Sequence, residues 1–266
     1  MAQKVVLISG GSSGIGLACA RSFASAGYRV YEISRSGHDQ EGIRHLTADV
    51  TDMRSLRQAF AQLASEVDGL DVLICSAGYG IAGSVECTAE EAMERQFDVN
   101  VYGTVRLVQL ALPLLREREG RCFFISSVAA VLSLPFQAFY SATKSCLNQL
   151  ALALNNELRP AGLSFTAIMP GDLATGFTGV RDYPRLQREQ DLYGEIPARA
   201  IEKMARDEEA GDSPEKMARY ILKLAERKRR PRPLLGFGLK YRAALLLAKL
   251  LPAGLSHYIL GKMYCK

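Results

Sequence analysis

Three side chains in this sequence are spaced so that they could act together on one carbonyl group. Tyr140 and Lys144 lie four residues apart in a segment with a helical pattern, and residues four apart share one face of a helix. A nearby cation favours the phenolate, so we expect Lys144 to lower the pKa of Tyr140 from its ordinary value near ~10. Ser127 follows an expected buried strand at residues 122–125, and its hydroxyl could hydrogen-bond the same substrate oxygen. The group predicts proton transfer to a ketone or from an alcohol, although such a Tyr–Lys pair also occurs by chance on helix surfaces.

A glycine-rich segment near the N-terminus indicates a dinucleotide site. Residues 5–8 predict a buried strand, residues 9–16 are rich in glycine, and a helical pattern then continues to Ala26. Glycines let the backbone approach a pyrophosphate, and the helix N-terminus offers free N–H groups. A plain flexible turn is the alternative, but the flanking strand and helix favour a cofactor site. The residues expected to contact the phosphates are Gly10, Ser12, Ser13, Gly14, Ile15 and Gly16.

The end of the second expected strand, residues 29–33, favours NADP(H) over NAD(H). At this position a carboxylate suits a free ribose 2′-hydroxyl, whereas an arginine accommodates a 2′-phosphate. The chain has Ser34 and then Arg35, with no acid directly beyond. A guanidinium can grip a phosphate as a fork and stack on adenine. The alternative is that Arg35 is a solvated loop charge.

The rest of the pattern predicts an α/β fold with a single doubly wound parallel sheet, the Rossmann fold. Further strands are expected at 46–50, 71–75, 122–125 and 163–169, with helices at about 88–115 and 140–158. Thr51 or Asp52 should cap the helix after the third strand. Parallel strands end at one edge of the sheet, where ligands bind. The cofactor contacts expected from the third and fourth strand ends are Asp49, for the adenine amino group, Val50, Ala77 and Gly78.

The motifs together resemble those of the short-chain dehydrogenase/reductase superfamily, over roughly the first 175 residues. They are Ser9-Gly10-x-x-x-Gly14-Ile15-Gly16, Asn100-Val101-Tyr102-Gly103, Ser127, Tyr140-x-x-x-Lys144 and Pro170-Gly171 through Thr175. One departure is Cys75-Ser76-Ala77-Gly78, where the family has Asn-Asn-Ala-Gly, so backbone bracing must come from elsewhere.

This resemblance implies a role for each catalytic residue. Tyr140 would be the general acid/base and Ser127 would orient the carbonyl. Lys144 would lower the tyrosine pKa and bind the nicotinamide ribose, and Asn100 would hold a relay water. The further cofactor contacts that it implies are Tyr140, Lys144, Pro170, Gly171, Leu173 and Thr175. Family members usually form homodimers or homotetramers through the helices that carry Asn100 and Tyr140.

Composition excludes several other classes. The 266 residues carry a net charge of only +5, and no groove-reading motif accompanies the basic run 227–232, so nucleic acid is not expected as a partner. The six cysteines lack C-x-x-C spacing, and three histidines show no ligand spacing, so we expect neither disulfides nor a metal. The first strand starts by Lys4 and no run approaches a membrane span, so we expect a cytoplasmic protein.

The C-terminal third is expected to determine which substrate is bound. We predict one catalytic domain at 1–238, with a charged, aromatic helical lid at about 176–212, and a leucine-rich helical extension at 239–266 packed on it. The basic run reads as a solvated helix end before a last strand at 233–236, or as a membrane or acidic-partner patch. The extension could cover the substrate pocket, meet a partner subunit or lie on a membrane surface.

The predicted function is an NADP(H)-dependent oxidoreductase that interconverts a ketone or aldehyde and an alcohol. The leucine-rich tail resembles that of hydroxysteroid and retinol dehydrogenases, which favours a hydrophobic, steroid- or retinoid-like small molecule as substrate. Reduction of small polar or sugar-like carbonyls is the alternative. A catalytically retired NADP-binding regulatory protein is a third hypothesis, which the intact catalytic residues disfavour.

Overall fold

Seven parallel strands form one sheet in the order β3-β2-β1-β4-β5-β6-β7. The structure is a computed structural model that describes residues 3–183 and 186–265. The strands are β1 (Val5–Ser9), β2 (Arg29–Ser34), β3 (Ile43–Thr47), β4 (Val72–Cys75), β5 (Arg121–Ile125), β6 (Ser164–Met169) and β7 (Leu234–Gly236). The order reverses between β1 and β4, which leaves a crevice at the carboxyl ends of these strands. The expected doubly wound parallel sheet is confirmed.

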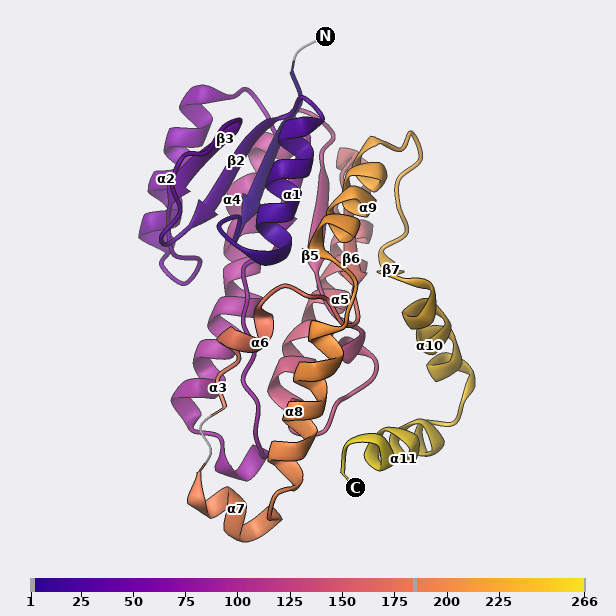
Figure 1. Ribbon diagram of the computed structural model, residues 1–266. Helices are drawn as coiled ribbons and strands as arrows, with labels where there is room; N and C mark the ends of the chain where they lie inside the picture. The colour runs from indigo at the N-terminus through magenta and orange to yellow at the C-terminus, as the bar shows by residue number, and fades with distance from the viewer. Residues whose placement is uncertain (1–2, 184–185, 266) are drawn as a thin grey trace.

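Helices cover both faces of the sheet (Figure 1). They are α1 (Gly14–Ser25), α2 (Met53–Glu66), α3 (Glu90–Phe97), α4 (Gly103–Arg116), α5 (Ala138–Glu157), α6 (Phe177–Val180), α7 (Gln187–Tyr193), α8 (Ile196–Glu209), α9 (Pro214–Glu226), α10 (Leu239–Leu250) and α11 (Ala253–Tyr264). Short helical turns occur at Val85–Cys87, Asp98–Tyr102, Val128–Ala130 and Arg159–Ala161.

The core lies in two layers because side chains of each strand alternate between the two faces. Leu7 and Phe124 point to the layer under α2, α4 and α5, whereas Ile8 and Phe123 point to the layer under α1 and α9. All four are fully buried. Since both faces are covered, the strands read as continuous apolar runs, which is why the sequence revealed them.

The third strand runs from Ile43 to Thr47 rather than over the predicted residues 46–50. Its parallel register pairs Val30 with Ile43 and Ser34 with Thr47, so the ladder ends where β2 ends. Two polar residues, Arg44 and His45, hid the start of this edge strand from the apolar pattern. The chain then turns, because the Asp49 carboxylate accepts hydrogen bonds from the Thr51 amide and hydroxyl at 2.9 and 2.8 Å.

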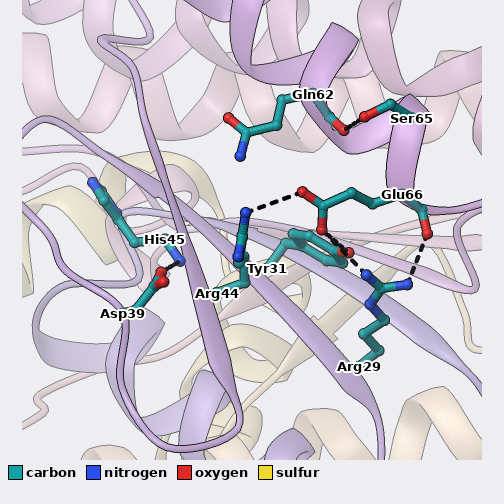
Figure 2. A network of polar contacts seen from close by, with 8 residues as sticks. All are labelled: Arg29, Tyr31, Asp39, Arg44, His45, Gln62, Ser65 and Glu66. Atoms are coloured by element: carbon teal, nitrogen blue, oxygen red, sulfur yellow. Dashed lines mark hydrogen bonds and ion pairs between the residues drawn. The ribbon is translucent and has the colours of Figure 1, made fainter.

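The end of α2 is tied to the sheet edge by one carboxylate (Figure 2). Glu66 accepts hydrogen bonds from Arg29 at 3.1 Å, from the Tyr31 hydroxyl at 2.9 Å and from Arg44 at 3.2 Å. At the other end Asp52, one of the two expected caps, accepts from the Arg54 amide at 2.9 Å. The network fixes α2 against β2 and β3, which carry the adenosine end of the crevice.

The predicted helix at 88–115 is interrupted by a π-helical turn at Asp98–Tyr102 that separates α3 from α4. A π turn inserts one extra residue per turn and often occurs at functional sites, and nothing in the apolar pattern predicts it. It carries Asn100, which is buried. The turn therefore places a candidate site residue in the interior.

The C-terminal elements follow the expected pattern. The described part of segment 176–212 contains the helices α6, α7 and α8, and Ser213 caps α9 by accepting from the Lys216 amide at 3.3 Å. The basic run 227–232 joins α9 to β7, and its cations are exposed. Helices α10 and α11 lie at the periphery beyond β7 (Figure 1).

Candidate active site

A cavity of about 1230 Å³ opens at the carboxyl edge of the sheet. Half of the predicted cofactor residues line it: Gly10, Ser12, Ser13, Ser34, Arg35, Asp49, Val50, Ala77 and Gly78. They come from the ends of β1, β2 and β4 and from the turn after β3. Arg35 is exposed at this cavity, at the β2 end. A groove of this size, with a cation at one end, suits an extended dinucleotide.

The glycine-rich turn has the close packing that a dinucleotide cradle needs. A Cβ at Gly16 would lie 2.1 Å from the Gly10 carbonyl oxygen, and one at Gly10 would lie 2.9 Å from the Ala77 backbone. Gly14, Ile15 and Gly16 begin α1, so their amides point from the helix N-terminus toward the turn. The residues present therefore fit a bound nicotinamide dinucleotide.

Replacing Gly16 by alanine is expected to destabilise the protein by about 1–3 kcal/mol and to abolish tight NADPH binding. The new methyl group must displace the Gly10 carbonyl, which distorts the turn. Thermal unfolding and NADPH titration measure the two effects. Gly261→Ala in α11 is the control, since a Cβ there meets nothing within 4 Å. Wild-type binding by the Gly16 variant would contradict this role of the turn.

Tyr140, Ser127 and Lys144 come together beyond this cavity. The Ser127 hydroxyl is hydrogen-bonded to the Tyr140 phenol. Lys144 Nζ lies 5.5 Å from the centre of the Tyr140 ring and donates to the Ile125 carbonyl at 2.8 Å. Tyr140 and Lys144 lie one turn apart on α5, and Ser127 follows β5, as the sequence indicates. The arrangement can donate a proton to an oxygen held by Tyr140 and Ser127.

The expectation that Lys144 lowers the Tyr140 pKa is wrong. Burial raises the pKa of Tyr140 to about 12. The hydrogen bond with Ser127 and the charge of Arg181 lower this pKa, but their effect is smaller than that of burial. Lys144 does not relieve it, because its ammonium points to the Ile125 carbonyl and burial lowers its own pKa to about 8. A phenol with so high a pKa stays protonated at neutral pH, as a proton donor must.

Replacing Lys144 by methionine is expected to raise the free energy of unfolding by about 3 kcal/mol below pH 8. The unfolded chain keeps the ordinary lysine pKa of 10.5, whereas the folded pKa is about 8. The unfolded state therefore binds the proton more tightly, and this destabilisation is full below pH 8 and fades as the pH rises toward 10.5. Urea unfolding of the wild type and of Lys144→Met, measured from below pH 8 to pH 10.5, checks this pH dependence. A difference that is constant with pH would contradict the account.

The bracing lost with the family's asparagines is supplied by other side chains. Ser9 Oγ accepts from the amides of Ser76 and Ala77, each at 3.2 Å. Gln96, which the sequence did not single out, donates to the Tyr79 carbonyl at 2.7 Å and accepts from the Ile81 amide at 2.8 Å. No motif marks Gln96, because its role follows from the packing of α3 on the loop after β4.

Asn100 takes part in the same bracing. Its amide nitrogen donates to the Tyr79 carbonyl at 2.9 Å and to Thr143 Oγ1 at 3.2 Å, and its oxygen accepts from the Tyr79 amide at 3.1 Å. A Cβ at Gly78 would lie 3.1 Å from Asn100 Oδ1 and 3.8 Å from Lys144 Nζ, so both groups flank this glycine. The water relay implied by the family resemblance remains a prediction.

The segment after β6 lies beside the glycine-rich turn. The Pro170 carbonyl accepts from the Val128 amide at 2.8 Å, which joins it to the Ser127 segment. Thr175 would be in contact, at 3.6 Å, with a Cβ at Gly14. Leu173 is buried and pairs in an isolated bridge with Asp212, and the Tyr241 ring of α10 covers Gly171. These residues lie outside the lining of the large cavity, as do Gly14–Gly16 and the cluster of Ser127, Tyr140 and Lys144.

The segment expected to form a lid packs over Tyr140. The Phe177 ring of α6 lies 5.6 Å from the Tyr140 ring, and Arg181 lies 5.6 Å from the Phe177 ring. The Arg181 side chain is only 3% exposed and forms an ion pair with Glu208 of α8. On α7, Glu189 is buried and accepts from the Ser84 amide. Phe177 and Arg181 of this segment therefore lie next to Tyr140, and the sequence analysis did not identify Arg181.

Residues 4–183 match the short chain dehydrogenase family. This chain belongs to that family. It is an oxidoreductase of the class that acts on alcohol and keto groups. Within the part of the chain that the structure describes, no cluster of three or more metal-ligating side chains occurs, and no helix is long and apolar enough to cross a bilayer.

Two curated relatives and one solved structure show the range of the similarity. A 3-ketodihydrosphingosine reductase of Bacteroides thetaiotaomicron is 36% identical over 233 residues, which is 87% of each protein. Human 17-beta-hydroxysteroid dehydrogenase type 1 is 36% identical over 195 residues, 66% of this chain and 59% of the human protein. A short-chain dehydrogenase from Streptomyces avermitilis superposes with a TM-score of 0.78 at 27% identity, covering 94% of this chain and 93% of its own.

Proposed function

We propose that this protein is an NADPH-dependent reductase of a lipophilic ketone, with Tyr140 as the general acid. The observation that carries the proposal is the Tyr140 phenol, hydrogen-bonded to Ser127 and one helical turn from Lys144, beside a dinucleotide-sized groove. The bound nicotinamide would supply the hydride. Ser127 and Tyr140 would hold the ketone oxygen, and the Tyr140 hydroxyl would give its proton to that oxygen as the alcohol forms.

The cofactor assignment rests on the end of β2. Glu32, the nearest acid, is buried under Gly11, accepts from Ser34 Oγ at 3.2 Å and contacts the His45 ring. It does not line the cavity, whereas Ser34 and Arg35 do. An arginine at the end of β2, with the carboxylate of that strand outside the cavity lining, favours the 2′-phosphate of NADP(H).

The substrate assignment rests on the lid and on the relatives. Phe177 covers Tyr140 with an aromatic surface, which favours an apolar group beside the reacting carbon. The 3-ketodihydrosphingosine reductase, which is matched over 87% of its length, is named for a long-chain keto lipid, and the human relative is named for a steroid. Both support a bulky, lipophilic ketone, so we extend the expected substrate class from steroid- and retinoid-like molecules to long-chain keto lipids. The small polar carbonyl remains the alternative.

A substrate panel tests the proposal. NADPH consumption, with NADH in parallel, should be measured against small aldehydes, sugar-like ketones, steroid and retinoid carbonyls and a long-chain 3-keto amine. We expect turnover of the bulky ketones with NADPH. Turnover of small polar carbonyls alone would overturn the substrate assignment, and NADPH binding without turnover of any of them would favour the regulatory hypothesis.

The remaining features of the working enzyme are proposals of the same kind. We infer a cytoplasmic homodimer or homotetramer, made of one catalytic domain at 1–238 and the helical extension at 239–266. Leu147 of α5 is buried in the core, and Leu150 and Leu154 pack against it, so an interface on this helix would use its exposed residues, such as Leu152. Light scattering during gel filtration tests the assembly.

A further inference from the structure

The charges of this chain are divided unevenly along its length. Residues 227–266 contain ten of the 33 lysines and arginines and none of the 28 aspartates and glutamates. The preceding 226 residues therefore carry 23 basic against 28 acidic side chains, a net charge of −5. The ten cations are Arg227, Lys228, Arg229, Arg230, Arg232, Lys240, Arg242, Lys249, Lys262 and Lys266. A strongly basic tail on an acidic body points to an anionic surface as its partner.

Helix α10 presents apolar side chains to solvent along one stripe. Leu239, Leu246 and Leu250 are 84%, 61% and 73% exposed, and their spacing of seven and four residues places them on one face. Leu247 widens the stripe. The opposite face packs on the protein through Leu245, which is buried, and Tyr241, whose ring lies over Gly171. The exposed leucines are thus a second apolar face, not part of the core.

Cations border this stripe on both sides. At 3.6 residues per turn, Lys240 projects from one margin of the stripe, and Arg242 and Lys249 project from the other. All three are exposed. Leucines that enter the acyl region between lysines and arginines that reach the headgroups are the arrangement of a helix lying in a membrane interface.

Helix α11 continues the pattern. Leu255, Tyr258, Ile259 and Met263 are between 43% and 58% exposed at one helical face. Lys262 lies over the Tyr258 ring at 4.6 Å. The helix therefore adds apolar and cationic groups without any acid.

We propose that α10, α11 and the basic segment 227–232 dock on the surface of an anionic lipid bilayer. Charge complementarity selects this occupant: a second copy of the tail would bring ten cations against ten, whereas anionic headgroups neutralise them. The exposed leucines supply the apolar contact that a purely electrostatic encounter lacks. The docking is peripheral, in keeping with helices of 12 residues each.

Docking would place the candidate active site next to the membrane. The Tyr241 hydroxyl of α10 donates to Asp172, directly after Gly171 at the nicotinamide edge, and α11 packs against the lid helix α8. Membrane binding would therefore act on Asp172 and on α8, close to the proposed active site. The benefit for catalysis rests on the proposed function, because it assumes that a lipophilic ketone is delivered from the bilayer. The docking itself does not depend on the proposed function.

A tryptophan reporter tests the docking, since the chain has no tryptophan of its own. Leu246→Trp is expected to shift its emission to shorter wavelength on adding vesicles that contain phosphatidylglycerol, and to show little change with pure phosphatidylcholine. Leu192→Trp, at an exposed position of α7 in the lid, is the matched control and should show no shift. Equal shifts at both positions, or none at Leu246, would overturn the proposal.

Charge variants give a second readout. Lys240→Gln with Lys249→Gln should lower the partition coefficient on anionic vesicles about 30-fold, from about 1 kcal/mol for each cation near the surface. Arg57→Gln with Arg116→Gln, on α2 and α4, should leave it unchanged. Unchanged binding by the tail variant would contradict the proposal.

A self-association test uses the Leu246→Trp variant without vesicles. An emission at shorter wavelength that depends on protein concentration would contradict the proposal, because it would assign this face to contact between copies of the protein. Tyr140→Phe should bind vesicles like the wild type, so loss of docking and loss of the proposed reaction are distinguishable.

Discussion

Tyr140→Phe is expected to lower kcat/KM for ketone reduction by about 10³-fold or more, with NADPH affinity changed by less than about threefold. The ring is kept, so its contact with Phe177 at 5.6 Å and its packing on α5 remain. What disappears is the hydroxyl that Ser127 contacts and that would protonate the ketone oxygen. Steady-state kinetics and NADPH fluorescence titration measure the two effects separately.

Tyr220→Phe is the matched control for that change. Tyr220 of α9 carries the same phenol, packs on the Phe237 ring away from the cavity lining and should keep wild-type activity. Undiminished reduction by Tyr140→Phe would remove the tyrosine from the mechanism. Equal loss in both variants would point to a general effect on folding, which thermal unfolding would reveal.

The second large effect is expected at the adenosine end of the groove. Arg35→Gln should weaken NADPH binding about 10- to 100-fold and leave NADH binding nearly unchanged, because a hydrogen bond to a charged group contributes about 1.5–3 kcal/mol. Glu32, the acid of β2, is buried below Gly11 and does not line the cavity, whereas Arg35 does. Steady-state kinetics with each cofactor at saturating ketone give the ratio of kcat/KM for NADPH to kcat/KM for NADH.

Arg57→Gln is the control, since Arg57 is exposed on α2 and does not line the cavity. An unchanged NADPH preference in Arg35→Gln would mean that another group holds the phosphate. Arg106 would then be the next candidate, because it also lines the cavity, although it pairs with Asp98 at 2.7 Å. An NADH preference of the wild type would overturn the cofactor assignment itself.

Most of the fold could be predicted because the sheet is buried on both sides. Strands such as β1 and β5 appear as short apolar runs between turn residues, and parallel order then follows from the helices between them. The edge strand β3 was misplaced because the polar residues Arg44 and His45 interrupt its apolar pattern, so the apolar run starts too late. The π turn at Asn100 was missed because its hydrogen bonding depends on packing against the loop after β4.

The candidate site divides in the same way. The positions of Gly16 and Ser13 could be predicted from the strand-turn-helix pattern. The pairing of Tyr140 with Lys144 could be predicted from helical spacing. The hydrogen bonds by which Ser9 and Gln96 hold the loop after β4 could not be predicted from either pattern, because their partners are more than a dozen residues away in the sequence. The electrostatics also depend on three-dimensional burial. The sequence suggested a lowered Tyr140 pKa, whereas burial around Tyr140 and Lys144 raises the first and lowers the second.

The central claim is that hydride reaches a lipophilic ketone at the carbon whose oxygen Tyr140 protonates. The most direct measurement is a single turnover with NADPH deuterated at the transferring position of nicotinamide C4, a long-chain 3-keto amine or a steroid ketone, and mass spectrometry of the product. We predict an alcohol that carries one deuterium at the former carbonyl carbon with the wild type, and none formed by Tyr140→Phe on the same time scale. Bound NADPH that leaves every ketone unreduced, or deuterium transfer that survives in Tyr140→Phe, would contradict the account.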